Sequence, residues 1–264
     1  MFVLTHLFFS IGELFYSSYK NFKVRIAKQK LPPQDINILS NLFPYYAGLS
    51  DIHKKEFVEK VEWFIAEKEF LPRGELKAVT QEMKLLISAT AVKVTFGFQG
   101  MTLKHFRRIL IYQDSYYSTI NKQYHQGEVN PKLGVIVLSW ENFVRGFIKN
   151  DDGVNLGIHE IAHAMKLENQ IHYNRESNFF NPILWGKYSE LAKSEIQKIR
   201  SQESSLFRSS AGVNEHEFFA VALEAFFEKS SKFKSYNERL YQSLVYLLRQ
   251  DPMVLTKNSQ GANP

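Results

Sequence analysis

The chain has 264 residues, of which 44% are hydrophobic and 14% aromatic, enough to fill the core of a globular domain and to exclude an intrinsically disordered protein. It contains no cysteine, which excludes disulfide frameworks and thiolate metal sites, so any metal ion must be held by His, Asp or Glu. The formal net charge of +6 is spread over 33 basic and 27 acidic residues, and this mild bias argues against nucleic-acid binding. Because the lack of cysteine fits a reducing compartment, we expect a cytoplasmic protein.

Residues 1–33 form an apolar and basic N-terminal segment. Its run MFVLTHLFFSIGELFYSSY is interrupted by His6, Gly12 and Glu13 and is followed by lysine and arginine residues. A signal peptide would carry its positive charge before the apolar run. A membrane-spanning helix needs a run of about 20 residues that is less interrupted by polar residues than this one. Two interpretations stay open: a helix in the membrane interface, with peripheral membrane contact through residues 1–30, or a helix docked on the domain or on a partner.

A proline-marked break, KLPPQD at 30–35, separates this segment from the rest of the chain. No internal repeat or low-complexity tract interrupts the sequence after it. We therefore expect a domain over residues 34–258, followed by a C-terminal tail at 259–264.

Hydrophobic periodicity predicts both helices and strands in this domain. Two amphipathic helices come first, one in DIHKKEFVEKVEWFIAEK with Ser50 as its N-cap and one in VTQEMKLLISATAVKVTFG between Thr80 and Gly97. RRILIYQ and GVIVLSW are short β-branched runs typical of strands, and the sequence from Asn155 onward is typical of helices. The predicted fold class is α+β, mostly helical with a small central sheet.

The motif HEIAH, within GVNLGIHEIAHAM, predicts a metal site on a helix. Side chains at positions i and i+4 lie one above the other, so His159 and His163 can bind one zinc ion. Glu160 would then lie beside the open coordination position, where it can take a proton from a zinc-bound water and pass it to a leaving amine. The alternative is a chance match with one exposed and one packed histidine.

A catalytic zinc site also needs a third protein ligand. A third histidine six residues after the second is excluded, because that position is Asn169, and Lys166 replaces the glycine of that pattern. The remaining candidates are later carboxylates, namely Glu190, Glu195, Glu203, Glu215, Glu217 and Glu224.

The predicted helix NEHEFFAVALEAFFEKS favours two of these carboxylates. Glu217 and Glu224 share one stripe of this helix with Val221, among several phenylalanines. Burying a carboxylate is expensive unless a positive partner meets it, which predicts zinc beside one glutamate and a histidine N–H or an arginine beside the other. The alternative places both carboxylates at a solvated edge of the helix.

These motifs resemble the family of Mlc titration factor A, zinc-dependent peptidases with a glutamate as the third ligand. The resemblance runs from about residue 40 to 253 and rests on segments in the family's order: FVEKVEWFIAEKEF, RRILIYQDSYY, VIVLSWENFVRG, GVNLGIHEIAHAM, NEHEFFAVALEAFFE and YQSLVYLLRQDP. NEHEFFA is also similar to the third-ligand helix of the anthrax lethal factor protease domain, which is related in its catalytic core.

The resemblance implies a zincin-like metallopeptidase domain with one Zn²⁺ ion per chain. It assigns His159, His163 and Glu217 as zinc ligands and Glu160 as the general base and acid. It implies aminopeptidase-like activity on a peptide or protein substrate, with GVIVLSW as the edge strand that pairs with the substrate at the cleft. Because enterobacterial members bind the glucose-responsive repressor Mlc, a transcriptional repressor is also a candidate partner.

One position departs from the family pattern. The family usually has a tyrosine seven residues before the glutamate ligand, where its hydroxyl helps to stabilise the oxyanion, and here that position is Ser210. Loss of one oxyanion donor typically lowers turnover about 100- to 1,000-fold. We therefore expect metal binding with weak catalysis, unless His216 or His172 replaces the missing donor. Ser210, Asn214 and Glu224 are the residues expected around the ligands and the oxyanion.

Three functions follow from these alternatives. The main prediction is a zinc metallopeptidase linked to transcriptional regulation. The second is a weakly active or inactive zinc-binding protein that sequesters a regulator such as a sugar-responsive repressor. The third is a scaffold at the membrane edge without a metal ion.

Overall fold

The structure is a computed structural model that describes residues 28–118, 122–149, 151–171 and 178–256. The N-terminal helix predicted before Lys28 and the tail at 259–264 lie outside the described residues, and the domain boundaries remain predictions. Within the described ranges, no helix is both long enough and apolar enough to cross a bilayer.

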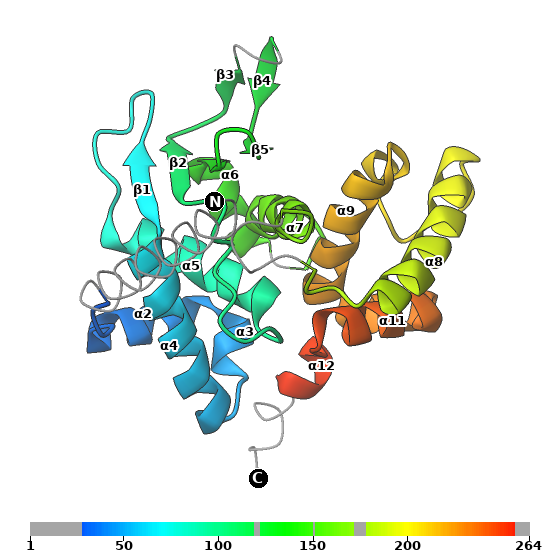
Figure 1. The fold of residues 1–264 in the computed structure, drawn as a ribbon, viewed down its shortest axis with the longest axis horizontal. Coiled ribbons are helices and arrows are strands. Elements are labelled where there is room, and N and C mark those ends of the chain that lie inside the picture. The colour runs from blue at the N-terminus through cyan, green and yellow to red at the C-terminus, as the bar shows by residue number, and fades with distance from the viewer. Residues whose placement is uncertain (1–27, 119–121, 150, 172–177, 257–264) are drawn as a thin grey trace, which may run out of the picture.

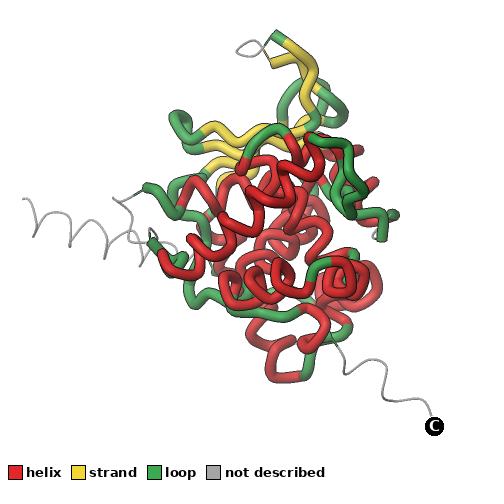
Figure 2. Tube along the Cα trace, turned by 90° about the vertical axis from the view of Figure 1, so that its right-hand side faces the viewer, coloured by secondary structure: helices red, strands yellow, loops and turns green. Residues whose placement is uncertain are grey.

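Helices dominate the fold, and the strands gather at one end of it (Figure 2). The helices of the described ranges are α2 (Pro33–Leu42), α3 (Pro44–Ala47), α4 (Asp51–Glu67), α5 (Gln81–Thr95), α6 (Trp140–Ile148), α7 (Leu156–Glu168), α8 (Pro182–Arg200), the 3-10 helix η1 (Ser209–Gly212), α9 (Glu215–Glu228), α10 (Ser230–Tyr236), α11 (Glu238–Leu248) and α12 (Pro252–Leu255). The strands are β1 (Glu69–Pro72), β2 (Arg108–Tyr112), β3 (Tyr116–Ser118), β4 (Gln123–His125), β5 (Gly127–Asn130) and β6 (Val135–Ser139). The α+β, mostly helical class predicted from the sequence is confirmed.

The two helices predicted in the first half of the domain begin at the expected residues. The Ser50 side chain accepts a hydrogen bond from the backbone N–H of His53 at the start of α4, and Thr80 accepts one from Met83 at the start of α5. These caps satisfy backbone donors that the first turn of a helix leaves free. Helix α5 is buried along most of its length and packs against both α4 and α7.

The main sheet has the strand order β1-β2-β6-β5. Strands β1, β2 and β6 run parallel, and β5 pairs antiparallel to β6. The prediction that GVIVLSW forms the edge strand is wrong, because β6 lies between β2 and β5. All five residues of β6 are buried, and a continuous apolar run is typical of an interior strand. The edge strand beside α7 is β5, whose sequence GEVN is short and polar.

Helix α7 occupies the middle of the molecule, between the sheet and the group formed by α8, α9 and α11 (Figure 1). It packs against α5, α6, α9, β5 and β6. One hydrophobic core joins α5, the sheet, α7 and α9, so these elements are held in fixed positions relative to one another. The HEIAH motif is therefore carried by a helix in the middle of the fold.

Candidate metal site

Helix α7 presents its two histidines on one side and buries the opposite side. It begins after Asn155, whose Oδ1 accepts a hydrogen bond from the backbone N–H of Ile158 at 3.0 Å. Ile158 and Ile161 are buried in the core. The side chains of His159 and His163 are 15% and 16% exposed. This nearly equal exposure differs from the chance interpretation, in which one histidine is exposed and the other is packed.

Helix α9 brings its first turn to the same place. Asn214 caps this helix, because its Oδ1 accepts hydrogen bonds from the backbone N–H groups of His216 at 2.8 Å and Glu217 at 3.0 Å. The cap fixes Glu217 in the first turn, facing α7. Asn214, predicted near the site, therefore contacts the backbone of Glu217, whose side chain meets the two histidines.

His159, His163 and Glu217 form the one cluster in the described ranges that could hold a metal ion. The two Nε2 atoms are 3.1 Å apart, and the Glu217 oxygens lie 3.5 Å from His159 Nε2 and 3.2 Å from His163 Nε2. Ligands of a tetrahedral zinc ion at about 2.0 to 2.1 Å are separated from one another by about 3.3 Å. One donor atom from each residue lies within 4.8 Å of the other two, so the cluster is close to the spacing that such an ion requires.

The buried glutamate of α9, Glu224, has the positive partners that the sequence predicts. Glu224 is 1% exposed, and its Oε1 lies 2.8 Å from His159 Nδ1, where that ring nitrogen donates a hydrogen bond. The Arg208 guanidinium donates to both Glu224 oxygens, at 2.6 and 3.0 Å. A hydrogen bond at Nδ1 leaves His159 Nε2 as the atom that can face a metal ion.

Arg208 was missed from the sequence, although it lies only two residues before Ser210. Its Nε donates a hydrogen bond to Ser210 Oγ at 3.0 Å, so this hydroxyl is used in holding the arginine. His216 is exposed on the first turn of α9, and His172 lies outside the described residues. The other carboxylate candidates are not part of the cluster; Glu195, for example, is buried and accepts hydrogen bonds from Ser205 and Tyr236.

Glu160 lies on the side of α7 that meets the edge strand β5. Its residue surface is only 5% exposed, and a methyl group at Gly127 would lie 2.5 Å from Glu160 Oε1. Gly127 therefore leaves the space that the carboxylate occupies. The sequence did not reveal this contact, because it joins two segments that are not adjacent in the chain.

The electrostatics of the cluster favour a positive charge. Burial lowers the pKa of His159, but hydrogen bonds to Glu217 and Glu224 outweigh it and raise the pKa to about 10. Hydrogen bonds from His159 and His163 hold the pKa of Glu217 well below its usual range. Burial raises the pKa of Glu160 to about 7; His159 opposes this shift, and Glu217 and Glu224 add to it. Several carboxylates thus surround one point, where a cation would be stabilised.

The sequence of this chain is similar to those of known proteins over most of its length. Residues 17–249 match the family described as glucose-regulated metallo-peptidase M90. An uncharacterized protein of Synechocystis sp. is 25% identical over 245 residues, which cover 87% of this chain and 88% of the relative. Mlc titration factor A of Yersinia pestis is 26% identical over 244 residues, covering 84% of this chain and 87% of the relative, and the protein of that name from Yersinia pseudotuberculosis gives the same values.

Proposed function

We propose that this chain, which belongs to the M90 family of glucose-regulated metallo-peptidases, is a zinc-dependent peptidase of the HExxH-plus-glutamate type. The family membership confirms the resemblance inferred from the motifs, and it identifies the protein as a member of a metallopeptidase family. The identity of the metal, the ligand set and the role of each residue are the proposal.

The observation that carries the proposal is the spacing of three donor atoms from two helices. The Nε2 atoms of His159 and His163 lie 3.1 Å apart; Glu217 Oε2 lies 3.5 Å from the first and Glu217 Oε1 lies 3.2 Å from the second, close to the spacing of ligands around one tetrahedral ion. Two imidazoles and one carboxylate, with no thiolate available, are a donor set found in catalytic zinc sites that keep a fourth position open. These three residues would therefore hold Zn²⁺.

The remaining residues of the site have roles that follow from their contacts. When bound, zinc acts as a Lewis acid that polarises a peptide carbonyl and lowers the pKa of water. Glu160 accepts the proton from the attacking water and donates it to the leaving amine. Glu224 orients His159 by accepting a hydrogen bond from its Nδ1, which keeps Nε2 directed at the cluster, and Arg208 holds Glu224 in place by donating to both of its oxygens.

The edge strand β5 offers a place for an extended peptide. It pairs with β6 on one side only, and it lies beside α7 close to Glu160. An edge strand carries backbone N–H and C=O groups with which a peptide can form a further strand. We assign substrate pairing to β5 in place of the predicted GVIVLSW strand, and we expect aminopeptidase-like cleavage.

The test measures metal content and hydrolysis in the same preparations. We expect about one zinc ion per chain by mass spectrometry, and hydrolysis on a panel of chromogenic aminoacyl and peptide substrates. Glu160→Gln should keep the metal and lose activity about 100- to 10,000-fold. Glu190→Gln, at an exposed position of α8, is the matched control and should change neither quantity. Undiminished hydrolysis by the zinc-loaded Glu160→Gln protein would exclude the assigned mechanism.

A second candidate function is sequestration of a regulator with weak or no hydrolysis. It is favoured by Ser210, which replaces the family's tyrosine and whose Oγ is engaged by Arg208. The name of the Yersinia relatives, Mlc titration factor A, connects those proteins with the regulator Mlc. Repressor capture that persists in Glu160→Gln, without cleavage of any substrate, would favour this function. Increased hydrolysis by Ser210→Tyr would favour a peptidase weakened at its oxyanion donor.

A further inference from the structure

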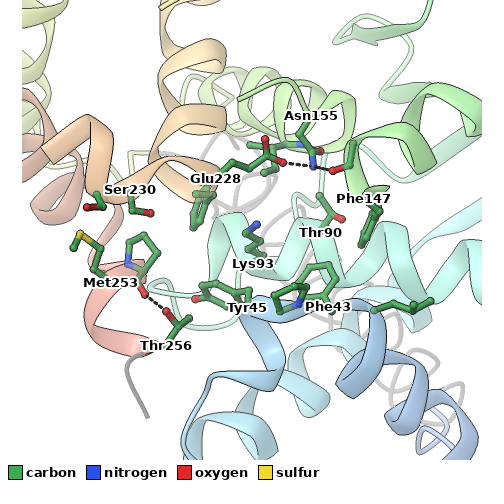
Figure 3. A pocket seen from close by; sticks show the side chains of 17 residues that line it. Phe43, Tyr45, Thr90, Lys93, Phe147, Asn155, Glu228, Ser230, Met253 and Thr256 are labelled. Atoms are coloured by element: carbon green, nitrogen blue, oxygen red, sulfur yellow. Dashed lines mark hydrogen bonds between the residues drawn. The ribbon is translucent and has the colours of Figure 1, made fainter. Parts of the chain in front are cut away.

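A cavity of about 410 Å³ lies where the ends of several helices meet, apart from the metal-binding cluster (Figure 3). Its walls come from the end of α2, from α3, α5, α6, α9, α10 and α12, and from the start of α7. None of His159, His163 and Glu217 lines it. Its volume is in the range of cavities that bind small molecules.

Lys93 extends into this cavity from α5 without a hydrogen-bonding partner. Its Nζ lies 5.8 Å from the ring centroids of Phe43 and Tyr45 and 5.3 Å from that of Phe227. Throughout the described ranges, no hydrogen bond or ion pair to Nζ is formed. An ammonium group has three N–H donors, which aromatic faces satisfy only in part. A ligand with an anionic oxygen would complete its coordination.

Glu228 supplies the opposite charge from the end of α9. Its Oε1 accepts a hydrogen bond from Asn155 Nδ2 at 2.8 Å, whereas its Oε2 is buried and has no hydrogen-bonding partner. Glu228 and Lys93 line the same cavity, yet they are too far apart to form an ion pair (Figure 3). A buried carboxylate oxygen without a donor is costly. Because protein atoms enclose Oε2, a ligand in the cavity can donate to this carboxylate once the Glu228 side chain turns toward the cavity.

We propose that this cavity binds a small zwitterion of the amino-acid class. The ligand carboxylate would contact Lys93 Nζ, and its ammonium group would donate to the Glu228 carboxylate after that side chain turns its enclosed oxygen toward the cavity. An apolar side chain would then lie against the rings of Phe43, Phe147 and Phe227, which line the same space. A ligand with only one of the two charges would leave the other protein group without a partner.

The ionisation of the two groups agrees with this arrangement. Burial lowers the pKa of Lys93 to about 8, with Glu228 acting in the opposite direction. Burial raises the pKa of Glu228 to about 7, opposed by its hydrogen bond from Asn155 and by Lys93. The charged form of each group is therefore only partly compensated in this place, and a zwitterion supplies further compensation for both.

The test titrates L-phenylalanine into the full chain by calorimetry, beside phenylacetate and phenethylamine, which each carry one of its two charges. We expect L-phenylalanine to bind, and Lys93→Met and Glu228→Gln each to weaken it about tenfold or more, because each removes a charged hydrogen-bonding partner. The two single-charge compounds should bind weakly to every protein. Lys187→Met and Glu190→Gln, exposed on α8, are the matched controls and should bind normally.

Two samples distinguish binding in the cavity from binding at the metal site: the His163→Ala variant and metal-free protein. Both should still bind L-phenylalanine, because neither change touches the cavity. Loss of binding in these two samples would place the ligand at the metal site and overturn the proposal. Absence of binding at millimolar concentration, or equal affinity for Lys93→Met, Glu228→Gln and the parent protein, would also overturn it. Circular dichroism of each variant establishes that it is folded.

Discussion

The two ends of helix α9 carry carboxylates in opposite situations. In the first turn, Glu217 faces two histidines. About two turns further along the same helix, Glu224 is paired with Arg208 and His159. At the last turn, Glu228 has one oxygen without a partner, across a cavity from Lys93. The comparison suggests that a network of fixed partners positions reacting groups, whereas unpaired opposite charges leave room for a ligand.

Among substitutions that leave the proposed ligands and Glu160 itself unchanged, the largest effect is expected from filling the space beside Glu160. Gly127→Ala would place a methyl group 2.5 Å from Glu160 Oε1, so the carboxylate must move. Since a displacement of about 1 Å can cost about 100-fold in rate, we expect turnover to fall by about that factor while zinc is retained. The measurement is kcat together with metal content.

Gly186→Ala is the control for this substitution, because a methyl group at Gly186 in α8 has no atom within 4 Å. It should leave turnover unchanged. Equal turnover in Gly127→Ala and Gly186→Ala would show that the contact between β5 and Glu160 does not position the carboxylate.

An intermediate effect is expected from Glu224→Gln at the paired end. The change removes the negative charge that holds His159 Nδ1 and Arg208, so zinc affinity should fall about 10- to 100-fold. The measurement is competition for zinc with a fluorescent chelator. Glu228→Gln, at the unpaired end of the same helix, is the matched control and should bind zinc normally. Equal zinc affinities in Glu224→Gln and Glu228→Gln would show that the pairing of Glu224 with His159 and Arg208 does not contribute to zinc binding.

The smallest effect is a pH-dependent gain in stability from Glu228→Gln. The pKa of Glu228 is raised to about 7 in the folded protein, so its contribution to stability is full below the unfolded value of about 4.5 and is lost as the pH rises through 7. Glutamine is neutral at every pH, so the variant does not lose this stability as the pH rises. We expect Tm to rise by about 2 to 4 °C at pH 8 and to be nearly unchanged at pH 4.5.

Thermal melts at the two pH values check this prediction. Glu190→Gln, exposed on α8, should show no such dependence. The same gain at both pH values would mean that the stabilisation does not come from the charge of Glu228.

Much of the fold could be predicted because its signals are local. The caps Ser50 and Thr80 and the strands RRILIYQ and GVIVLSW depend on neighbours within a few residues. The order of the strands could not be predicted in the same way. GEVN is too short and polar to stand out as a strand, yet it forms the edge and places GVIVLSW in the interior.

The sequence by itself determined the HEIAH pair, because the 3.6-residue period of a helix places His159 and His163 on one side wherever that helix lies. It also indicated that Glu217 and Glu224 need positive partners, since phenylalanines surround them. Only the tertiary structure decided that Arg208 pairs with Glu224, that Gly127 makes room for Glu160, and that Lys93 and Glu228 share a cavity. These contacts join helices and strands far apart in the chain, and packing of the common core brings them together.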